Sequence, residues 1–338
     1  SEVIRNEYDR DRHPALYYVI LHCATRAAGM EEAPARFPSV LFGLGSVLAF
    51  YFLLRDHVRY WLALTGTLAL ALDTNFISQA RDIGNFAMLI FFSILSSLFF
   101  LRLVHGQSGA GVSRKTAALY LLSTALLGLS NFLFVFIIAA QAAFFIIISL
   151  IRKSFDRRLS FVVAAAFLLC LPGLWLLLNG FFSDMPLRMT ASHGNYSVWW
   201  EQTRYQFILG ITSYFFPMPP GIRHFFVIFT QAVSVFILVT MAGRPLRRFS
   251  IPLYAILVFV PVLASFILLL PYARLKVLYL VFVLPFFVLF LFSGIESCSN
   301  HTQTAGENRL VRTLFLFVPT VVILAMQSCS FFFSLVMF

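Results

Sequence analysis

The sequence predicts an all-α integral membrane protein with about ten transmembrane helices and one helix lying at the outer membrane surface. Three observations support this fold class: the composition, the recurrence of long apolar runs, and the position of the basic residues. Hydrophobic residues make up 60% of the 338 positions, charged residues only 12%, and the mean hydropathy is +0.87. A soluble domain has about 25% charged residues, so this composition is typical of a chain in lipid.

The apolar runs give the number of spans. A helix needs about 20 apolar residues to cross the hydrocarbon core. The run 117–151 is too long for one span, and its GLSN segment (128–131) predicts a turn that divides it into 117–129 and a second span. The stretch 60–73 is short, but it follows a basic loop and is counted. The clear candidates are 38–54, 83–103, 159–179, 223–243, 251–271, 277–297 and 313–336, which brings the count to ten.

The basic residues predict the orientation. When ten spans alternate, one side collects 14 of the 25 Lys and Arg residues but only four of the 14 Asp and Glu residues. Cytoplasmic loops carry such an excess, so this side is predicted to be cytoplasmic. The net charge of +11 therefore reflects orientation, and nucleic acid is not an expected partner. The 14 residues are Arg55, Arg59, Arg102, Arg114, Lys115, Arg152, Lys153, Arg157, Arg158, Arg244, Arg247, Arg248, Arg309 and Arg312.

The opposite, outer side holds the segments that connect the spans there. Residues 1–37 form an outer segment, and 38–338 form the transmembrane domain with a long outer loop at 180–222. Within the outer segment, residues 14–29 are apolar but short and include one His and one Arg. This pattern predicts an amphipathic helix lying at the membrane interface.

Ionisable residues near the outer rim are the candidates for chemistry, because charges at membrane depth cost free energy. A first group, just before the predicted interfacial helix, contains Glu7, Asp9, Asp11 and His13. Its carboxylates suit a base that deprotonates an acceptor hydroxyl or amine, or a group that positions a metal. A solvated, charged surface segment is the plainer interpretation.

Two further groups carry basic residues. Arg81 lies in a short outer loop between Asp73 and Asp82, and a guanidinium binds a pair of phosphate oxygens well; an Arg–Asp pair at a helix end is the alternative. Arg274 and Lys276 lie in a loop of about five residues between two apolar spans (272–276). They suit an anionic headgroup, or they extend toward ordinary lipid phosphates.

Four segments, in order, resemble one family of polytopic enzymes. Residues 11–18 (DRHPALYY) resemble the D-x-H-P-P-L-Y-Y signature of GT-C glycosyltransferases related to dolichyl-phosphate-mannose protein mannosyltransferases and bacterial aminoarabinose lipid A transferases. Residues 35–43 (ARFPSVLFG) are similar to that family's A-L-R-L-P-S-A-L-F-G. Residues 78–81 (SQAR) are similar to its S-Q-E-A-R, and residues 279–285 (YLVFVLP) to its R-Y-L-x-x-x-L-P.

The resemblance implies a membrane-embedded site on the periplasmic or lumenal side that moves a sugar from a polyprenyl- or dolichyl-phosphate carrier to a lipid, glycan or protein acceptor, with inversion. It implies that Arg81 contacts the carrier phosphate and that a carboxylate acts as base, with Glu7, Asp9 and Asp11 as candidates. The substrate-binding candidates are His13, Tyr17, Tyr18, Arg81, Arg274 and Lys276. We expect a bacterial inner membrane location, with the endoplasmic reticulum membrane as the alternative.

The sequence also departs from the family pattern. The family's first transmembrane helix and its acidic motif, often Asp-Glu, precede the D-x-H-P-P-L-Y-Y signature. Residues 1–13 contain no Asp-Glu pair, so we expect that helix upstream of Ser1, with Glu7, Asp9 or Asp11 as the alternative base. The family's second Pro is Ala15, the Glu before Ala-Arg is Gln79, and the late Arg is Leu278.

Other functions compete with a transferase. A divalent metal is optional for this chemistry, and no His/Asp cluster with ligand spacing requires one. A non-catalytic membrane scaffold remains an alternative, as does a transporter of a lipid-linked saccharide. A transporter would favour ionisable or broken helices near the midplane and internal repeats, whereas the charged candidates in this chain cluster at the outer rim.

Overall fold

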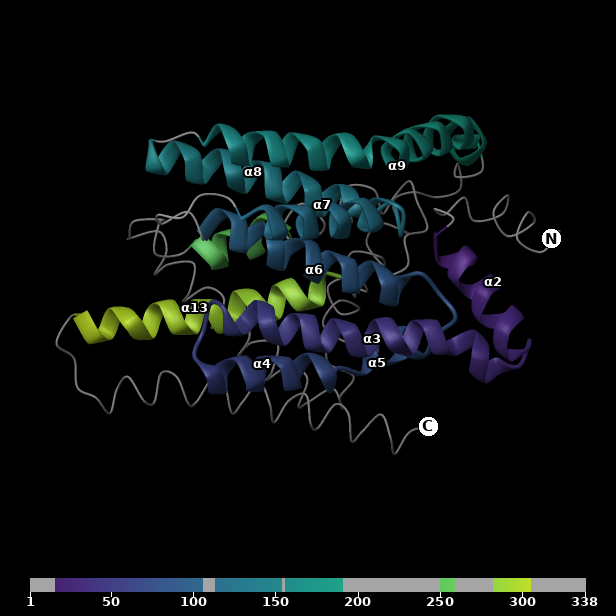
Figure 1. Ribbon diagram of the computed structural model, residues 1–338, viewed down its shortest axis with the longest axis horizontal. Helices are drawn as coiled ribbons and strands as arrows, with labels where there is room; N and C mark the ends of the chain where they lie inside the picture. Colours follow the sequence, from purple (N-terminus) through teal and green to yellow (C-terminus); the bar gives the residue numbers. More distant parts are fainter. Residues whose placement is uncertain (1–15, 106–112, 154–155, 191–249, 259–281, 305–338) are drawn as a thin grey trace. The chain divides into compact units, whose positions relative to one another are not determined.

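The structure, a computed structural model, describes residues 16–105, 113–153, 156–190, 250–258 and 282–304 (Figure 1). The regular elements within these ranges are helical, and no strand occurs among them. The predicted all-α class is therefore confirmed. Four described helices are long and apolar enough to cross a membrane: Glu32–Arg55, Phe86–His105, Phe134–Arg152 and Arg157–Trp175.

Several predicted spans fall wholly or partly outside this description. The spans 223–243 and 313–336 lie outside the described residues, and of 251–271 only residues 251–258 are described, as a helix. The count of ten spans therefore stays a prediction. The chain is divided into two compact units. Unit 1 comprises Ser1–Ala49, Ser78–Gly194 and Ser265–Arg274, and unit 2 comprises Phe50–Ile77, Asn195–Ala264 and Leu275–Phe338.

Unit 1 contains four helices that run side by side (Figure 1): α6 (Phe86–His105), α7 (Arg114–Gly128), α8 (Phe134–Arg152) and α9 (Arg157–Thr190). Helix α6 packs against α7 and α8, and α7 packs against α9. The long apolar run 117–151 is divided between α7 and α8, as its GLSN segment predicts. Helix α9 continues to Thr190, so it includes the first residues of the segment predicted to be the outer loop 180–222.

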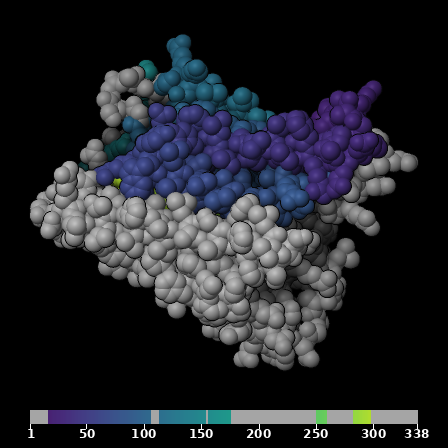
Figure 2. All heavy atoms as spheres, turned by 90° about the horizontal axis from the view of Figure 1, so that it is seen from below, coloured from purple at the N-terminus to yellow at the C-terminus, as the bar shows by residue number. Residues whose placement is uncertain are grey.

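The chain enters unit 1 through α2 (Leu16–Ala28) and α3 (Glu32–Arg55). Helix α2 lies within the predicted interfacial segment 14–29 and ends at Ala28, and the next residue, Gly29, has a φ of +97° that favours glycine. The side chains of α2 and the first turns of α3 form one continuous surface (Figure 2). Further along α3, Leu41, Leu44 and Leu48 are exposed at helical spacing, which suits a face in contact with lipid.

Unit 2 contains α4 (Tyr60–Ala71) and α13 (Leu284–Thr304), which pack against each other. An ion pair joins them at one end, because Nε of Arg59 lies 3.1 Å from Oε1 of the largely buried Glu296. Helix α4 has 12 residues, and such a helix is about 18 Å long. A hydrocarbon core is about 30 Å thick, so α4 by itself is too short to cross it, whereas the sequence predicts a span over 60–73.

Candidate functional site

A short polar chain at one end of unit 1 fixes α2. Tyr17 is 1% exposed, and its hydroxyl lies 2.9 Å from the hydroxyl of Ser39, about two turns into α3. Ser39 in turn donates to the Gly84 carbonyl, 3.4 Å away, just before α6. Because Ser39 has a single hydroxyl hydrogen, Tyr17 acts as the donor toward Ser39 when both bonds are formed. The chain therefore joins α2, α3 and the approach to α6.

Burial also changes the acidity of Tyr17. Desolvation raises the pKa of its phenol above the ordinary 10.0, because the charged phenolate loses hydration, and the negative charge of Asp82 acts in the same direction. The hydrogen bonds with Ser39 and the Gly84 backbone partly oppose this rise in the pKa. Tyr17 is therefore a neutral hydroxyl at physiological pH. Its ring meets the half-buried Tyr18 edge to face, with centroids 6.0 Å apart.

Helix α5 (Thr74–Arg81) presents the basic candidate of the short connector. Oδ1 of the buried Asp73 accepts the backbone N–H groups of Asn75 at 3.0 Å and Phe76 at 2.9 Å, so Asp73 caps the beginning of α5. Arg81 is the last residue of α5 and is exposed. Arg81 forms no ion pair with the carboxylates of the described residues, so its guanidinium is open to solvent.

A close contact holds the end of α5 against α3. A Cβ added at Gly43 would lie 2.6 Å from Cβ of Ala80, a distance that real Cβ atoms do not reach. Only glycine therefore allows α3 to approach the residue that precedes Arg81. The small side chains at this crossing fix the position of the Arg81 backbone within unit 1.

A pair of asparagines joins the beginning of α6 to the turn between α7 and α8. The backbone N–H of Leu133 donates to Oδ1 of Asn131 at 3.0 Å, and Nδ2 of Asn131 donates to Oδ1 of Asn85 at 3.3 Å. Both asparagines are buried. Together with the Tyr17 chain, this pair forms a cluster that we call the polar end of unit 1, made up of Tyr17, Ser39, Gly84, Asn85 and Asn131.

Two buried amide donors near Arg81 remain unsatisfied. Nδ2 of Asn85 and Nε2 of Gln79 have no hydrogen-bond partner among the residues that the structure describes. Asn85 is 5% exposed and Gln79 is 2% exposed. Beside Gly84, by contrast, a Cβ would meet no atom within 4 Å, so open space adjoins the backbone there. The polar end of unit 1 can therefore offer N–H groups to an oxygen-bearing ligand.

A second polar cluster lies between the middles of three helices and is internally complete. The Tyr120 hydroxyl donates to Oε1 of Gln141 at 2.8 Å, Nε2 of Gln141 donates to Ser96 at 3.0 Å, and Ser96 lies 2.8 Å from the Thr124 hydroxyl. All four residues are buried. Because its amide and hydroxyl groups are paired with one another, this cluster stabilises the packing of α6, α7 and α8.

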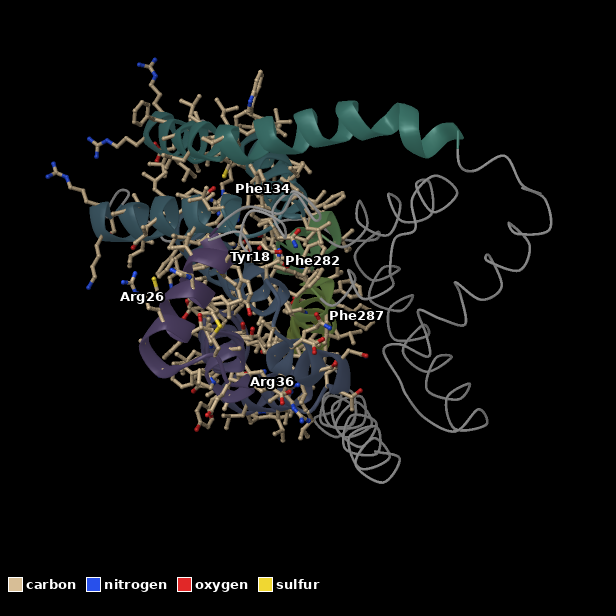
Figure 3. The ribbon with its side chains drawn as sticks, turned by 90° about the vertical axis from the view of Figure 1, so that its right-hand side faces the viewer. Tyr18, Arg26, Arg36, Phe134, Phe282 and Phe287 are labelled. Carbon is tan, nitrogen blue, oxygen red and sulfur yellow. The ribbon has the colours of Figure 1, made fainter. Side chains whose placement is uncertain are left out.

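The structure describes only some of the residues that the sequence singles out. Tyr17, Tyr18 and Arg81 are described, and Tyr17 is engaged with Ser39. Arg26 on α2 is exposed and points away from the helices (Figure 3). The candidates outside the described residues are Glu7, Asp9, Asp11, His13, Arg274 and Lys276. No group of three or more His, Cys, Asp or Glu residues that could hold a metal occurs within the described part, and the metal requirement stays open.

Sequence reasoning missed Ser39, Asn85 and Asn131. Ser39 lies in the segment that resembles the family and Asn131 in the predicted GLSN turn, but no charge or periodic pattern marks either of them, or Asn85, as a site residue. The predicted topology contained one usable signal, since it puts residues 83–85 and the turn at 128–131 on the same side of the membrane. Polar residues at those two positions can meet, and Asn85 and Asn131 do so.

Residues 12–175, nearly half of the chain, match the family described as dolichyl-phosphate-mannose-protein mannosyltransferase. No curated protein and no solved structure matches the chain. The matched stretch includes α2 to α8, the polar end of unit 1 and Arg81. With its apolar helices, the protein is an integral membrane protein, and the match over residues 12–175 supports a polytopic glycosyltransferase of the GT-C type.

Proposed function

We propose that the protein transfers a sugar from a polyprenyl- or dolichyl-phosphate carrier to an acceptor at the outer face of the membrane, with inversion at the anomeric carbon. The observation that carries this proposal is the family match over residues 12–175, which includes the open guanidinium of Arg81. The acceptor is a lipid, a glycan or a protein. A bacterial inner membrane fits this chemistry, with the endoplasmic reticulum membrane as the alternative.

The proposed reaction is a single displacement. The acceptor oxygen or nitrogen forms a bond to the anomeric carbon, and the bond from that carbon to the phosphate oxygen breaks with its electron pair on the phosphate. The acceptor proton passes to a carboxylate, for which Glu7, Asp9 and Asp11 are the candidates in this chain. Arg81 stabilises the negative charge that develops on the leaving phosphate.

The arrangement around Arg81 supports this role. The guanidinium is exposed at the end of α5, and the Gly43–Ala80 contact holds the backbone that carries it. The preceding α2 is fixed to the same unit by the buried Tyr17–Ser39 bond. The candidate carboxylates precede α2 in the sequence and lie outside the described residues, whereas α2 and Arg81 belong to the same unit.

The test measures sugar transfer from a radiolabelled polyprenyl-phosphate sugar in membranes that contain the full chain. Arg81→Ala should lower the transfer rate about a hundredfold, the loss typical of removing one stabilising group for a developing anion. Arg81→Lys should retain part of the rate, because it keeps a charge without the planar pair of donors. Arg26→Ala is the matched control, since Arg26 is also an exposed arginine in the last turn of its helix.

Two outcomes would contradict the proposal. One is the absence of transfer by the wild-type chain from every polyprenyl-phosphate sugar supplied. The other is an Arg81→Ala variant that is as active as the wild type, which would remove Arg81 from the site. Equal losses in Arg81→Ala and Arg26→Ala would attribute the effect to surface charge in general.

A further inference from the structure

The beginning of α6 has the backbone features of an anion-binding site. Asn85 immediately precedes the first helical residue, and its carbonyl accepts the N–H of Leu89 at 2.9 Å. The first turn of a helix leaves backbone N–H groups without intrahelical partners, and it carries about half a positive charge. An asparagine at this position usually satisfies one of those N–H groups with its side-chain oxygen. In α6 that oxygen binds Asn131 instead.

The orientation of the Asn85 amide follows from its partners. A backbone N–H can only donate, so the bond from Leu133 identifies Oδ1 of Asn131 as the acceptor. The other amide atom of Asn131 is therefore Nδ2, and it must meet the oxygen of Asn85. This leaves Nδ2 of Asn85 as a donor at the N-terminus of α6, and it has no partner among the described residues.

Further groups on the segment that leads to α6 favour an anion. Gln79 contributes a second buried amide donor without a partner in the described part of the chain. Arg81 is an exposed cation on the same connector, and open space adjoins the Gly84 backbone. Asp82 opposes an anion, since its negative charge also raises the pKa of Tyr17 in the polar end of unit 1, although its exposed side chain is partly screened by salt and water. A sugar hydroxyl would need acceptors as well as donors, whereas phosphate oxygens need only donors.

We propose that the N-terminus of α6, with Nδ2 of Asn85 and the guanidinium of Arg81, binds the phosphate group of a lipid phosphate. This inference rests on the proposed function, in which that phosphate is the leaving group. In the proposed function only Arg81 contacts the phosphate. The inference adds the side chain of Asn85 and the backbone of the first turn of α6 to that contact. Asn131 is the positioning residue, because its bond turns the Asn85 donor away from the α7–α8 turn.

The experiment measures equilibrium binding of radiolabelled decaprenyl phosphate to the purified full chain in detergent micelles. Asn85→Asp is the diagnostic variant, because aspartate keeps an oxygen for Asn131 and is a good helix cap, but replaces the donor with a negative charge. Binding should weaken at least tenfold, roughly the effect of losing one hydrogen bond to a charged group. Gly84→Val fills the open space without adding charge and should also weaken binding.

The control is Asn75→Asp, which adds the same charge to the first turn of α5. It should leave the dissociation constant within about twofold, because Asn75 is not part of the proposed contact. Equal weakening by Asn75→Asp and Asn85→Asp would overturn the inference in favour of a general charge effect. An Asn85→Asp chain that binds decaprenyl phosphate as tightly as the wild type would overturn it directly.

Two competitors separate the sources of binding. Decaprenol, which lacks the phosphate, should compete poorly, and effective competition by it would overturn the inference. Inorganic phosphate should compete weakly but measurably, and should do so less in Asn85→Asp; no competition by it at any concentration would count against a phosphate contact. A chain that binds decaprenyl phosphate through Asn85 yet transfers no sugar would leave this inference standing and contradict the proposed function. Sugar transfer by the wild-type chain, together with unchanged binding in Asn85→Asp, would leave the proposed function standing and overturn this inference.

Discussion

The hydroxyl of Tyr17 lies 2.9 Å from the hydroxyl of Ser39, with Tyr17 only 1% exposed. The first tyrosine of the DRHPALYY segment is thus part of the packing between α2 and α3. The adjacent Tyr18 is half-buried. The two neighbouring tyrosines therefore have different environments, and their variants should behave differently.

Tyr17→Phe should lower the free energy of unfolding by about 1 kcal/mol, because it removes one buried hydrogen bond and keeps the ring. Tyr18→Phe serves as the control, with a smaller change expected at a half-buried position. Thermal unfolding of both variants in detergent micelles gives the comparison. A stability of Tyr17→Phe equal to that of the wild type would show that the Ser39 bond contributes nothing net.

The raised pKa of Tyr17 makes stability depend on alkaline pH. The pKa of Tyr17 in the folded chain lies above 10.0, its ordinary value in the unfolded chain. At a pH between these two pKa values, Tyr17 is therefore more deprotonated in the unfolded chain than in the folded one. Stability is therefore fully present below about pH 10 and falls as the pH rises through the folded pKa. Tyr17→Phe should lose less stability than the wild type over this window. Ultraviolet titration should show that the folded Tyr17→Phe variant has one tyrosine fewer than the wild type among those that ionise at the highest pH. Identical titrations of the two chains would contradict a raised pKa at Tyr17.

The Gly43–Ala80 contact predicts a contrast between two glycines. Gly43→Ala should destabilise the chain by about 1–3 kcal/mol, because the new methyl group overlaps Cβ of Ala80 and α3 and α5 must move apart. Gly84→Ala is the matched control, since its methyl group meets open space. The midpoints of thermal unfolding test this contrast. If Gly43→Ala unfolds at the wild-type temperature, the two helices are not held as closely as described.

The polar cluster of α6, α7 and α8 should be cooperative. Gln141→Leu removes the amide and leaves Tyr120 and Ser96 without their partner, at a cost of about 1–3 kcal/mol. Adding Tyr120→Phe should recover part of that loss, because both partners of one bond are then apolar. A double-mutant cycle of unfolding free energies measures the coupling. Strict additivity would mean that the bond between Tyr120 and Gln141 is not a stabilising contact.

Hydrophobic run length and loop charge predicted most of the helices and which of their ends lie together. The predicted topology puts the loops at 102–115 and 152–158 on one side, and Arg152 donates to the Val104 carbonyl at 2.9 Å. It also puts Arg59 and Glu296 on one side, where they form an ion pair. These agreements arise because alternating spans fix the side of the membrane on which each helix end lies, and this does not depend on how the helices pack.

The details of the polar end of unit 1 were not predictable. Tyr17 and Ser39 are separated by 22 positions, and Asn85 and Asn131 by 46. No hydrophobic period specifies which uncharged polar residues will meet across such distances. Helix α5 was missed for a different reason, because its residues lie in the segment that the sequence predicts to be a short outer loop. Leu72 ends an apolar run smoothly, and only the cap formed by Asp73 shows that a new helix begins.

The cluster around Gln141 bears on how the chain is made. In the described structure, the residues that Gln141 bonds, Ser96 and Tyr120, both precede it in the sequence. A ribosome therefore delivers α6 and α7 to the insertion machinery before α8 appears. When the amide of Gln141 leaves water, its partners are already in the membrane, and it need not wait in lipid for a later segment. Because Ser96 and Tyr120 are synthesised before Gln141, this part of the chain can assemble in the order in which it is translated.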